Sequence, residues 1–246
     1  MPHFYIPKNN ICSGKFRLEK DESHHLIEVK RCKKGSKIQL FDGEGTSYSA
    51  EVTSVEKGFL SGIILEEIKS PQTLKEITLY SAIPKGDRFD WLIEKSAEIG
   101  VKSIVPIITQ RSVIKEFPDH KNDRWTRLSQ AASKQSGRTD IMNIAKPADF
   151  FEIVGKLPKD CCSIIPWEAE DSASIKGISE KIQNSCKINI FIGPEGGFTM
   201  QEVEYAKKVG LISVSLGPSI LRVETAALVS AALCFYLSGG FEKPGI

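Results

Sequence analysis

The sequence of 246 residues lacks the features of several large protein classes. Its apolar runs are only a few residues long, whereas a membrane-spanning helix needs about 20 apolar residues. The opening MPHFYIPKNN has no basic segment followed by an apolar one, the pattern of a secretory signal. The six cysteines and four histidines form no CxxC pair and no zinc-ligand spacing. We therefore expect a cytoplasmic protein with free thiols, no structural metal and no membrane partner.

A strong charge of one sign is also missing. The chain has 33 basic and 31 acidic residues, so its net charge of +2 does not by itself indicate a nucleic-acid partner. Two segments are nevertheless basic: residues 30–37 hold five cations and no acid, and residues 111–138 hold seven cations against three acids. Local patches of this kind can bind phosphates. The alternative for each patch is a solvated surface loop.

The first part of the chain has the rhythm of β-structure. Runs rich in β-formers cover residues 37–42, 47–55 and 59–68, and Asp42-Gly43 with Glu44-Gly45 suits a tight hairpin turn. Residues 69–76 contain a Ser-Pro break and polar side chains, which is typical of a linker. The length allows one large or two modest domains. This part therefore predicts a small β-barrel or sheet that forms a domain of its own.

After the linker, strands and helices alternate. Strands are predicted at 76–83, 103–109, 161–167, 188–193 and 212–216, and helices at 87–100, 119–135, 149–157, 174–182, 199–210 and 224–240. This order predicts an α/β domain, with a parallel sheet covered by helices on both faces. In the helix at 87–100, Trp91 falls opposite the apolar face, which indicates an interface.

A glycine-rich loop, FIGPEGGF at 191–198, gives the sharpest local signal. It follows a predicted buried strand and precedes a helix with Thr199 as N-cap and Glu202 in a capping box. Such a loop presents free backbone N–H groups at the carboxyl edge of a sheet. Neither GxxxxGK[ST] nor GxGxxG is present, and Glu195 would repel phosphate. The loop thus favours a neutral or cationic cofactor; the alternative is a turn without a ligand.

A second loop of the same kind, SLGPSILRVETAA at 215–227, follows the next strand. Two Gly-Pro loops after neighbouring strands would line one pocket. The alternative is two unrelated turns, with Arg222 and Glu224 simply pairing at a helix N-terminus, where an acid is favoured.

The predicted helix at 119–135 carries a basic stripe. If the helix runs far enough, Arg124, Arg127, Lys134 and Arg138 project within an arc of about 80°. The residues of the adjacent arc, which we expect to be buried, are Trp125, Leu128 and Ala132. A cationic stripe beside an apolar face suits a docked helix that shows its outer edge to a polyanion; a plain solvated face is the alternative.

Several motifs together resemble one family. They are GPEGGFT, LGPSILRVETAA, KGDRFDWLIEKSAEIGV at 85–101, PIITQRS at 106–112 and KQSGR at 134–138. This set is similar to the RsmE family of the SPOUT superfamily, bacterial enzymes that methylate N3 of a uridine in small-subunit (16S) ribosomal RNA. Residues 24–52 also resemble the PUA-like β-barrel domain of that family. The resemblance implies a PUA-like RNA-binding domain at 1–71 and a SPOUT methyltransferase domain at 72–246.

The resemblance implies more than a fold class. It implies a trefoil knot in the C-terminal half, an exception to the rule against threaded chains. It also implies S-adenosylmethionine as cofactor and a homodimer whose active sites lie at the interface. Arg222, Glu224 and Arg138 would be catalytic residues facing the uracil. The residues implied for the cofactor are Ile192, Gly193, Pro194, Glu195, Gly196, Gly197, Leu216, Gly217, Pro218, Ser219, Ile220, Leu221 and Pro166.

The implied partner is 16S ribosomal RNA or the small ribosomal subunit. The residues expected to contact it are Arg17, Lys30, Arg31, Lys33, Lys34, Lys85, Arg111, Arg124, Arg127, Lys134 and Gln135. The chain departs from the family pattern at Ser219, where an arginine is common, at His3 and at Lys134. Two rival functions are a related SPOUT enzyme acting on another base or on ribose, and a non-catalytic RNA-binding assembly factor. A dinucleotide-dependent oxidoreductase is disfavoured because neither fingerprint loop is present.

Overall fold

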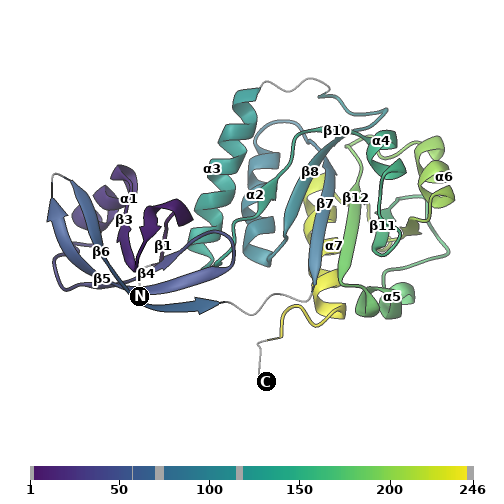
Figure 1. Cartoon of the computed structure of the whole chain (residues 1–246). Helices are drawn as coiled ribbons and strands as arrows, with labels where there is room; N and C mark the ends of the chain where they lie inside the picture. The colour runs from purple at the N-terminus through teal and green to yellow at the C-terminus, as the bar shows by residue number, and fades with distance from the viewer. Residues whose placement is uncertain (1–2, 57, 70–74, 115–118, 243–246) are drawn as a thin grey trace. The chain divides into compact units, whose positions relative to one another are not determined.

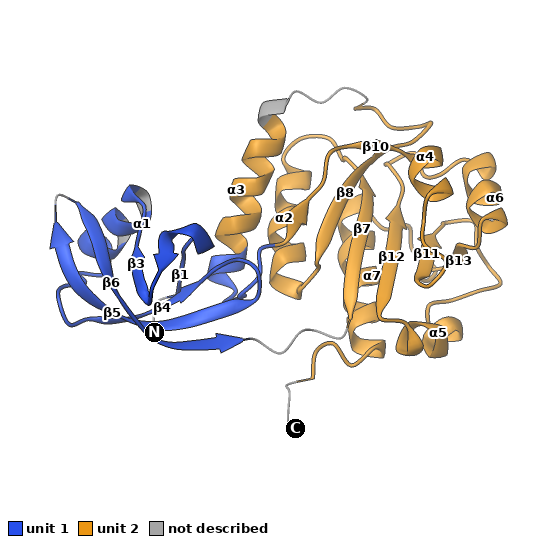
Figure 2. Ribbon diagram, in the orientation of Figure 1, with its two compact units in different colours: residues 1–72, 133–141 blue, residues 73–132, 142–246 orange. Residues whose placement is uncertain are grey.

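A computed structural model describes residues 3–56, 58–69, 75–114 and 119–242. The chain divides into two compact units, residues 1–72 with 133–141 and residues 73–132 with 142–246 (Figures 1 and 2). Residues 133–141 therefore belong to the first unit, although the prediction included them in the C-terminal domain. Each unit has a sheet of its own.

The first unit is built on a six-stranded sheet. Its strand order is β1 (His3–Tyr5), β4 (Lys37–Phe41), β5 (Thr46–Glu56), β6 (Phe59–Lys69), β3 (Lys15–Arg17) and β2 (Ile11–Cys12). β1 runs parallel to β4, and the other neighbours are antiparallel. The unit also contains a 3-10 turn at Lys8–Asn10, α1 (Lys20–His24) and a π-helical turn at His25–Val29. β4, β5 and β6 confirm the three predicted strands, and the shorter elements were not predicted.

The turn between β4 and β5 receives the segment 133–141. Asp42 shapes this turn, because its Oδ1 accepts hydrogen bonds from the amides of Glu44 at 2.8 Å and Thr46 at 3.0 Å. The amide of Gly45 donates to the carbonyl of Thr139 at 3.1 Å, and the amide of Ile141 donates to the carbonyl of Gly43 at 3.0 Å. Main-chain hydrogen bonds thus attach this distant segment to the sheet.

The second unit is built on a parallel sheet. Its strand order is β10 (Ala148–Asp149), β8 (Ser103–Ile108), β7 (Glu76–Ala82), β12 (Lys187–Ile192), β11 (Cys162–Pro166) and β13 (Ile212–Val214), and β9 (Asn143–Ile144) also pairs with β8. Every pairing is parallel. The predicted parallel sheet is confirmed, while the two-residue strands β9 and β10 were not predicted. All the carboxyl ends of these strands meet at one edge, where ligands bind in α/β proteins.

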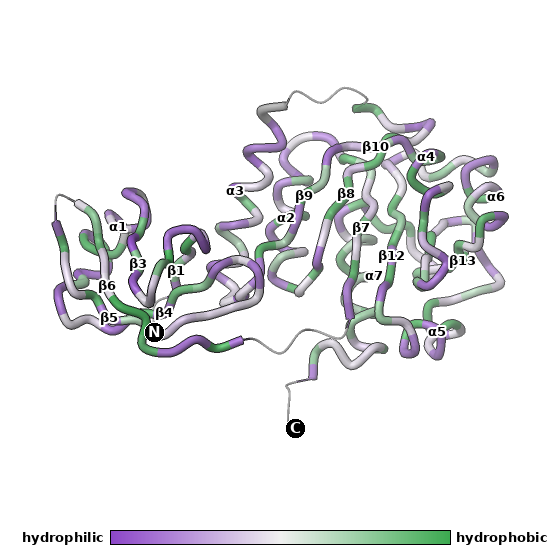
Figure 3. Tube along the Cα trace, in the orientation of Figure 1, coloured by the Kyte–Doolittle hydropathy of each residue, from purple (hydrophilic) through white to green (hydrophobic). Residues whose placement is uncertain are grey.

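Helices cover both faces of this sheet. One core joins the strands to α2 (Arg88–Ile99), α3 (Asp119–Gln135), α5 (Ser179–Asn184) and α7 (Val223–Leu237). A second core, on the other face, joins them to α4 (Phe150–Gly155) and α6 (Met200–Lys208). A 3-10 turn at Lys176–Ile178 precedes α5. Figure 3 shows α3 as largely hydrophilic, which fits a helix that buries only one stripe.

The stripe on α3 agrees with the prediction only in part. Trp125 and Ala132 are buried as expected, and Leu128 is partly buried. Arg138, however, does not continue the stripe, because α3 ends at Gln135 and Gly137 adopts a φ of 75°. A left-handed residue of this kind cannot extend a right-handed helix. The trefoil knot stays a prediction.

Two features are missing from the described residues. Among them, no helix is long and apolar enough to cross a membrane. Within the same part of the chain, no three His, Cys, Asp or Glu side chains gather into a metal-binding group.

Candidate active site

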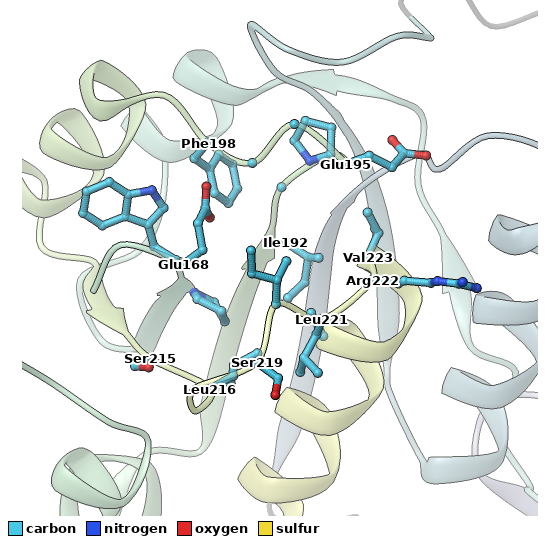
Figure 4. Close-up of a pocket in the computed structure, with 18 of the residues that line it drawn as sticks. Glu168, Ile192, Glu195, Phe198, Ser215, Leu216, Ser219, Leu221, Arg222 and Val223 are labelled. Atoms are coloured by element: carbon cyan, nitrogen blue, oxygen red, sulfur yellow. The ribbon is translucent and has the colours of Figure 1, made fainter. Parts of the chain in front are cut away.

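A cavity of about 410 Å³ lies at the carboxyl ends of β11, β12 and β13 (Figure 4). All the residues predicted to bind a cofactor line it, and so does Arg222. The two Gly-Pro loops therefore do share one pocket. The resemblance also implied the unnamed neighbours of Pro166 as a wall of this pocket. The lining residues that were not named individually as cofactor residues, Arg222 aside, are Arg88, Trp167, Glu168, Phe198, Ser215, Val223 and Ala226.

The glycine loop after β12 is shaped by close packing. A Cβ atom on Gly193 would lie 3.1 Å from the Phe198 ring, so the loop folds tightly over its own aromatic residue. Gly197 has a φ of 67°, a conformation that side chains other than glycine rarely adopt. α6 then begins with the predicted capping box, because Thr199 and Glu202 exchange side chain–backbone hydrogen bonds. The loop's three glycines, Gly193, Gly196 and Gly197, thus contribute only backbone to this wall.

Loops from two other strands brace the glycine loop. Glu195 accepts a hydrogen bond at Oε1 from the amide of Lys85, 3.0 Å away, after β7. Arg111, after β8, donates from Nη1 to the carbonyl of Gly196 at 2.7 Å. The amide of Gln110 donates to Oε1 of the buried Glu202 at 2.8 Å. Two residues expected to contact RNA, Lys85 and Arg111, therefore also hold the loop in shape.

The loop after β11 is fixed by a buried carboxylate, Glu170. It accepts hydrogen bonds from the amide and hydroxyl of Ser172, and from Nζ of Lys207 at 3.0 Å. These hydrogen bonds hold the pKa of Glu170 well below its ordinary value, with the Ser172 hydroxyl making the largest contribution. Lys207 also lies over the ring of Trp167, 5.7 Å from its centroid. The wall of the cavity that contains Trp167 and Glu168 is therefore rigidly supported.

The N-terminus of α7 carries two predicted catalytic residues, of which Arg222 lines the cavity and Glu224 does not. Arg222 is the N-cap residue and its side chain is exposed, with no ion-pair partner among the described residues. Glu224, in the first turn, is only 8% exposed, and its Oε2 has no hydrogen-bond partner within the described structure. Its Oε1 lies 3.9 Å from Nε of Arg88. Arg222 and Arg88 thus line the cavity, and the buried carboxylate of Glu224 lies behind Arg88, outside the lining.

The third predicted catalytic residue, Arg138, lies in the first unit. Its guanidinium binds the carboxylate of Asp140 through two hydrogen bonds, of 3.2 Å from Nε and 2.9 Å from Nη2. Its side chain is only 12% exposed. Because it belongs to the other unit, its role beside Arg222 stays a prediction.

The other residues of the first unit that are expected to contact RNA lie in different surroundings. The loop after the π-helical turn carries four exposed basic side chains, those of Lys30, Arg31, Lys33 and Lys34. Lys134 instead pairs with Glu22 and lies 5.9 Å from the centroid of the Tyr5 ring. Arg17 lies over the Phe59 ring at 4.6 Å, and Gln135 is exposed at the end of α3.

On α3, the cations of the second unit have local partners. Arg124 binds Asp90 of α2 at 2.5 Å, and the same carboxylate accepts the indole N–H of Trp125 at 3.1 Å. Arg127 donates from Nε to the carbonyl of Asp123 at 3.3 Å. Both arginines remain exposed. The basic stripe on α3 is therefore smaller than predicted. Arg124, one of its members, pairs with Asp90 and so helps to hold α3 against α2.

Trp167 and Glu168 had a signal that sequence reasoning did not use. They directly follow Pro166, the last residue of β11. Because ligands bind outside the carboxyl ends of parallel strands, any acid at that position is a site candidate. Arg88 had no comparable signal, since it reads as an ordinary residue at the start of an amphipathic helix.

Comparisons with known proteins agree with this architecture. Residues 70–234 match the family model of the RNA methyltransferase domain, and residues 18–65 match that of the RNA methyltransferase PUA domain. The chain is 32% identical to the ribosomal RNA small subunit methyltransferase E of Rickettsia conorii, over 97% of both chains.

Solved structures give the same result. The chain is similar to a ribosomal RNA small subunit methyltransferase E from Neisseria gonorrhoeae bound to S-adenosyl methionine, with a TM-score of 0.86, 33% identity and coverage of 96% of this chain and 98% of the other. It is also similar to a probable rRNA-methyltransferase from Porphyromonas gingivalis, with a TM-score of 0.88, 28% identity and coverage of 98% and 100%. The chain thus belongs to the ribosomal RNA small subunit methyltransferase E family, with a PUA domain followed by an RNA methyltransferase domain.

Proposed function

We propose that this protein methylates N3 of a uridine in 16S ribosomal RNA, in the cytoplasm, with S-adenosylmethionine as methyl donor. The observation that carries the proposal is the shared cavity of the two Gly-Pro loops, which is lined by Arg222 and by Arg88, whose Nε lies 3.9 Å from Oε1 of Glu224. Relatives over nearly the whole chain are small-subunit rRNA methyltransferases, and one of the similar structures is bound to S-adenosyl methionine.

The residues of the cavity fit this cofactor. A volume of about 410 Å³ lies within the usual range for small-molecule pockets. Two carboxylates, Glu168 and Glu195, belong to the lining and would repel a polyphosphate. The glycine loop, the loop at 216–221 and Pro166 would hold the cofactor mainly through backbone and apolar contacts. S-adenosylmethionine supplies an electrophilic methyl group carried on a sulfonium.

The chain's own residues would act on the uracil. N3 carries a weakly acidic proton, and Glu224 is the buried carboxylate with a free oxygen that can accept it, directly or through water. Negative charge then spreads onto O2 and O4 of the ring, where the open guanidinium of Arg222 stabilises it. Arg138 is proposed to contribute a further positive charge on the uracil. The uridine must first leave its stack to reach the cavity.

A homodimer is part of this proposal. Apolar side chains are exposed on α7 at Leu233 (39%) and Tyr236 (73%), and on α2 at Trp91 (45%). Exposed apolar groups of this kind on neighbouring helices suit a subunit interface. Sedimentation of the full chain as a monomer at micromolar concentration would contradict this part.

The reaction is tested by mapping modified nucleosides in small-subunit rRNA by mass spectrometry. Cells that lack this protein are expected to lose 3-methyluridine at one site, and the wild-type gene is expected to restore it. Unchanged 3-methyluridine, or the loss of a different modified nucleoside, would refute the proposed reaction. The absence of any change, together with no binding of S-adenosylmethionine in calorimetry, would favour an assembly factor instead.

The basic loop of the first unit is proposed to hold the rRNA by its phosphates. Changing Lys33→Glu and Lys34→Glu together is expected to weaken binding of a 16S rRNA fragment at low salt. It should also flatten the slope of log affinity against log salt concentration by about 0.7–0.9 for each phosphate that the loop no longer neutralises. Fluorescence anisotropy over a salt series measures both quantities.

The matched control is the double change Lys176→Glu and Lys187→Glu. Both lysines are exposed, and the change in net charge is the same. A slope that falls equally in both double variants would mean that total charge matters rather than this loop. An unchanged slope in the Lys33 and Lys34 variant would show the loop to be merely solvated.

A further inference from the structure

Glu168 is a carboxylate in the cavity wall that has no role in the proposed reaction. Its side chain is exposed to the cavity, and within the described residues it has no hydrogen bond or ion pair. It lies directly on the glycine loop, because a Cβ atom on Gly197 would be 2.2 Å from its Oε1 and 2.9 Å from its Cδ. Figure 4 shows the carboxylate pointing toward Phe198, across the cavity from Arg222.

The backbone that carries Glu168 is held in place from several sides. The amide of Trp167 donates to the carbonyl of Val214 at 3.0 Å, and the amide of Glu170 donates to the carbonyl of Trp167 at 3.2 Å. Glu170 is bound in turn by Ser172 and Lys207. Such a fixed loop loses little entropy when a ligand binds to it, so the backbone that carries Glu168 is preorganised.

The chemistry of this position restricts what it can bind. An ionised carboxylate only accepts hydrogen bonds, so the ligand must present donors. Glu195, the other acid of the lining, already accepts the amide of Lys85 at one oxygen. Glu168 is therefore the acidic acceptor of the cavity that remains fully available among the described residues.

The position of Glu168 also restricts which part of the methyl donor lies there. In the proposed reaction the methyl group lies beside Arg222, so the end of the cavity across from Arg222 holds a part of the donor that does not react. That end has an aromatic side chain, Trp167, in its lining, which suits a nucleoside more than a charged amino acid. The donors that a nucleoside presents as a neighbouring pair are its ribose hydroxyls, and the two oxygens of one carboxylate can accept both.

We propose that Glu168 binds the ribose hydroxyls of the methyl donor and so selects a ribonucleoside cofactor. This inference rests on the proposed function, since it assumes that an adenosyl compound occupies the cavity. Hydrogen bonds to a charged acceptor are the strong class. Loss of this interaction should therefore be visible in equilibrium binding, without any methyl transfer.

The test is titration calorimetry of the full chain with S-adenosylhomocysteine, which cannot react, and with its analogue lacking both ribose hydroxyls. Glu168→Ala is expected to bind S-adenosylhomocysteine about 10- to 100-fold more weakly than wild type, the range for hydrogen bonds to a charged group. Wild type should lose a similar factor with the dideoxy analogue, whereas Glu168→Ala should bind the two ligands equally. Glu204→Ala, an exposed acid on α6 outside the cavity, is the matched control and should bind like wild type.

Other outcomes separate this inference from the proposed function. If Glu168→Ala still discriminates against the dideoxy analogue as wild type does, the ribose assignment is wrong. If the variant loses affinity for S-adenosylhomocysteine but not for 5′-methylthioadenosine, which keeps the ribose and lacks the amino acid, Glu168 binds the ammonium group instead. Wild type that binds none of these ligands would overturn the proposed cofactor itself. An unchanged thermal unfolding midpoint excludes misfolding of the variant.

Discussion

Arg222→Ala is expected to slow single-turnover methylation of the rRNA substrate about 10²- to 10³-fold, the usual cost of removing one group that stabilises developing negative charge. The guanidinium is exposed at the N-terminus of α7 and forms no ion pair among the described residues, so its charge is available for the uracil anion.

Glu224→Gln should slow the same step by about 10²- to 10⁴-fold, because an amide cannot take the N3 proton.

Rapid-quench assays with excess enzyme measure these rates. Both variants should still bind S-adenosylhomocysteine, which separates a loss of chemistry from a loss of the cofactor site. Glu204→Gln is the matched control, because Glu204 is an exposed acid on α6 outside the cavity lining. Near wild-type rates for both Arg222→Ala and Glu224→Gln would remove these residues from the mechanism.

Gly62→Ala is expected to destabilise the first unit by about 3 kcal/mol, at the upper end for overpacking of a core. Gly62 lies within β6, paired with Phe16 of β3 and Val52 of β5. A Cβ atom there would be 2.0 Å from the backbone carbonyl oxygen of Glu51 and 2.6 Å from the Phe16 ring. Backbone cannot move aside as the end of a flexible side chain can, so the sheet itself must distort.

Two observables distinguish the units in this experiment. Hydrogen exchange of β5 and β6 amides reports on the first unit, while tryptophan emission reports on the second, since Trp91, Trp125 and Trp167 all lie there. Exchange should accelerate in the first unit. Gly177→Ala, where a Cβ atom would meet only Ser174 Oγ at 3.7 Å, should be neutral. Unaltered hydrogen exchange in Gly62→Ala would mean that the sheet accommodates the methyl group without losing stability.

The parts of the fold that sequence reasoning found are those with strong local patterns. The long strand β5 and amphipathic helices such as α2 show clear periodicity, and β12 is a largely apolar run. The strands β1, β2 and β3 are two or three residues long, too short for any period to appear. Their formation depends on partners elsewhere in the chain.

The residues of the candidate site divide in the same way, into those with a local sequence pattern and those that depend on tertiary packing. Both Gly-Pro loops carry their own turn chemistry, and the carboxyl ends of parallel strands converge, so the cavity could be predicted from the sequence. For Glu168 the place after β11 marks only a candidate, because its packing on the glycine loop depends on tertiary contacts such as the buried hydrogen bonds of Glu170. The pairing of Lys134 with Glu22 is equally invisible in sequence, since it depends on tertiary packing.

The hydrogen bonds from the β4–β5 turn to Thr139 and Ile141 have a consequence for biosynthesis. Protein chains emerge from the ribosome N-terminus first, and a domain folds once its last required residues are available. The sheet of the first unit is fully translated at Lys69, yet these hydrogen bonds must wait until residue 141 has left the exit tunnel. By then much of the second unit has been translated, so the N-terminal domain cannot finish folding as an independent early product.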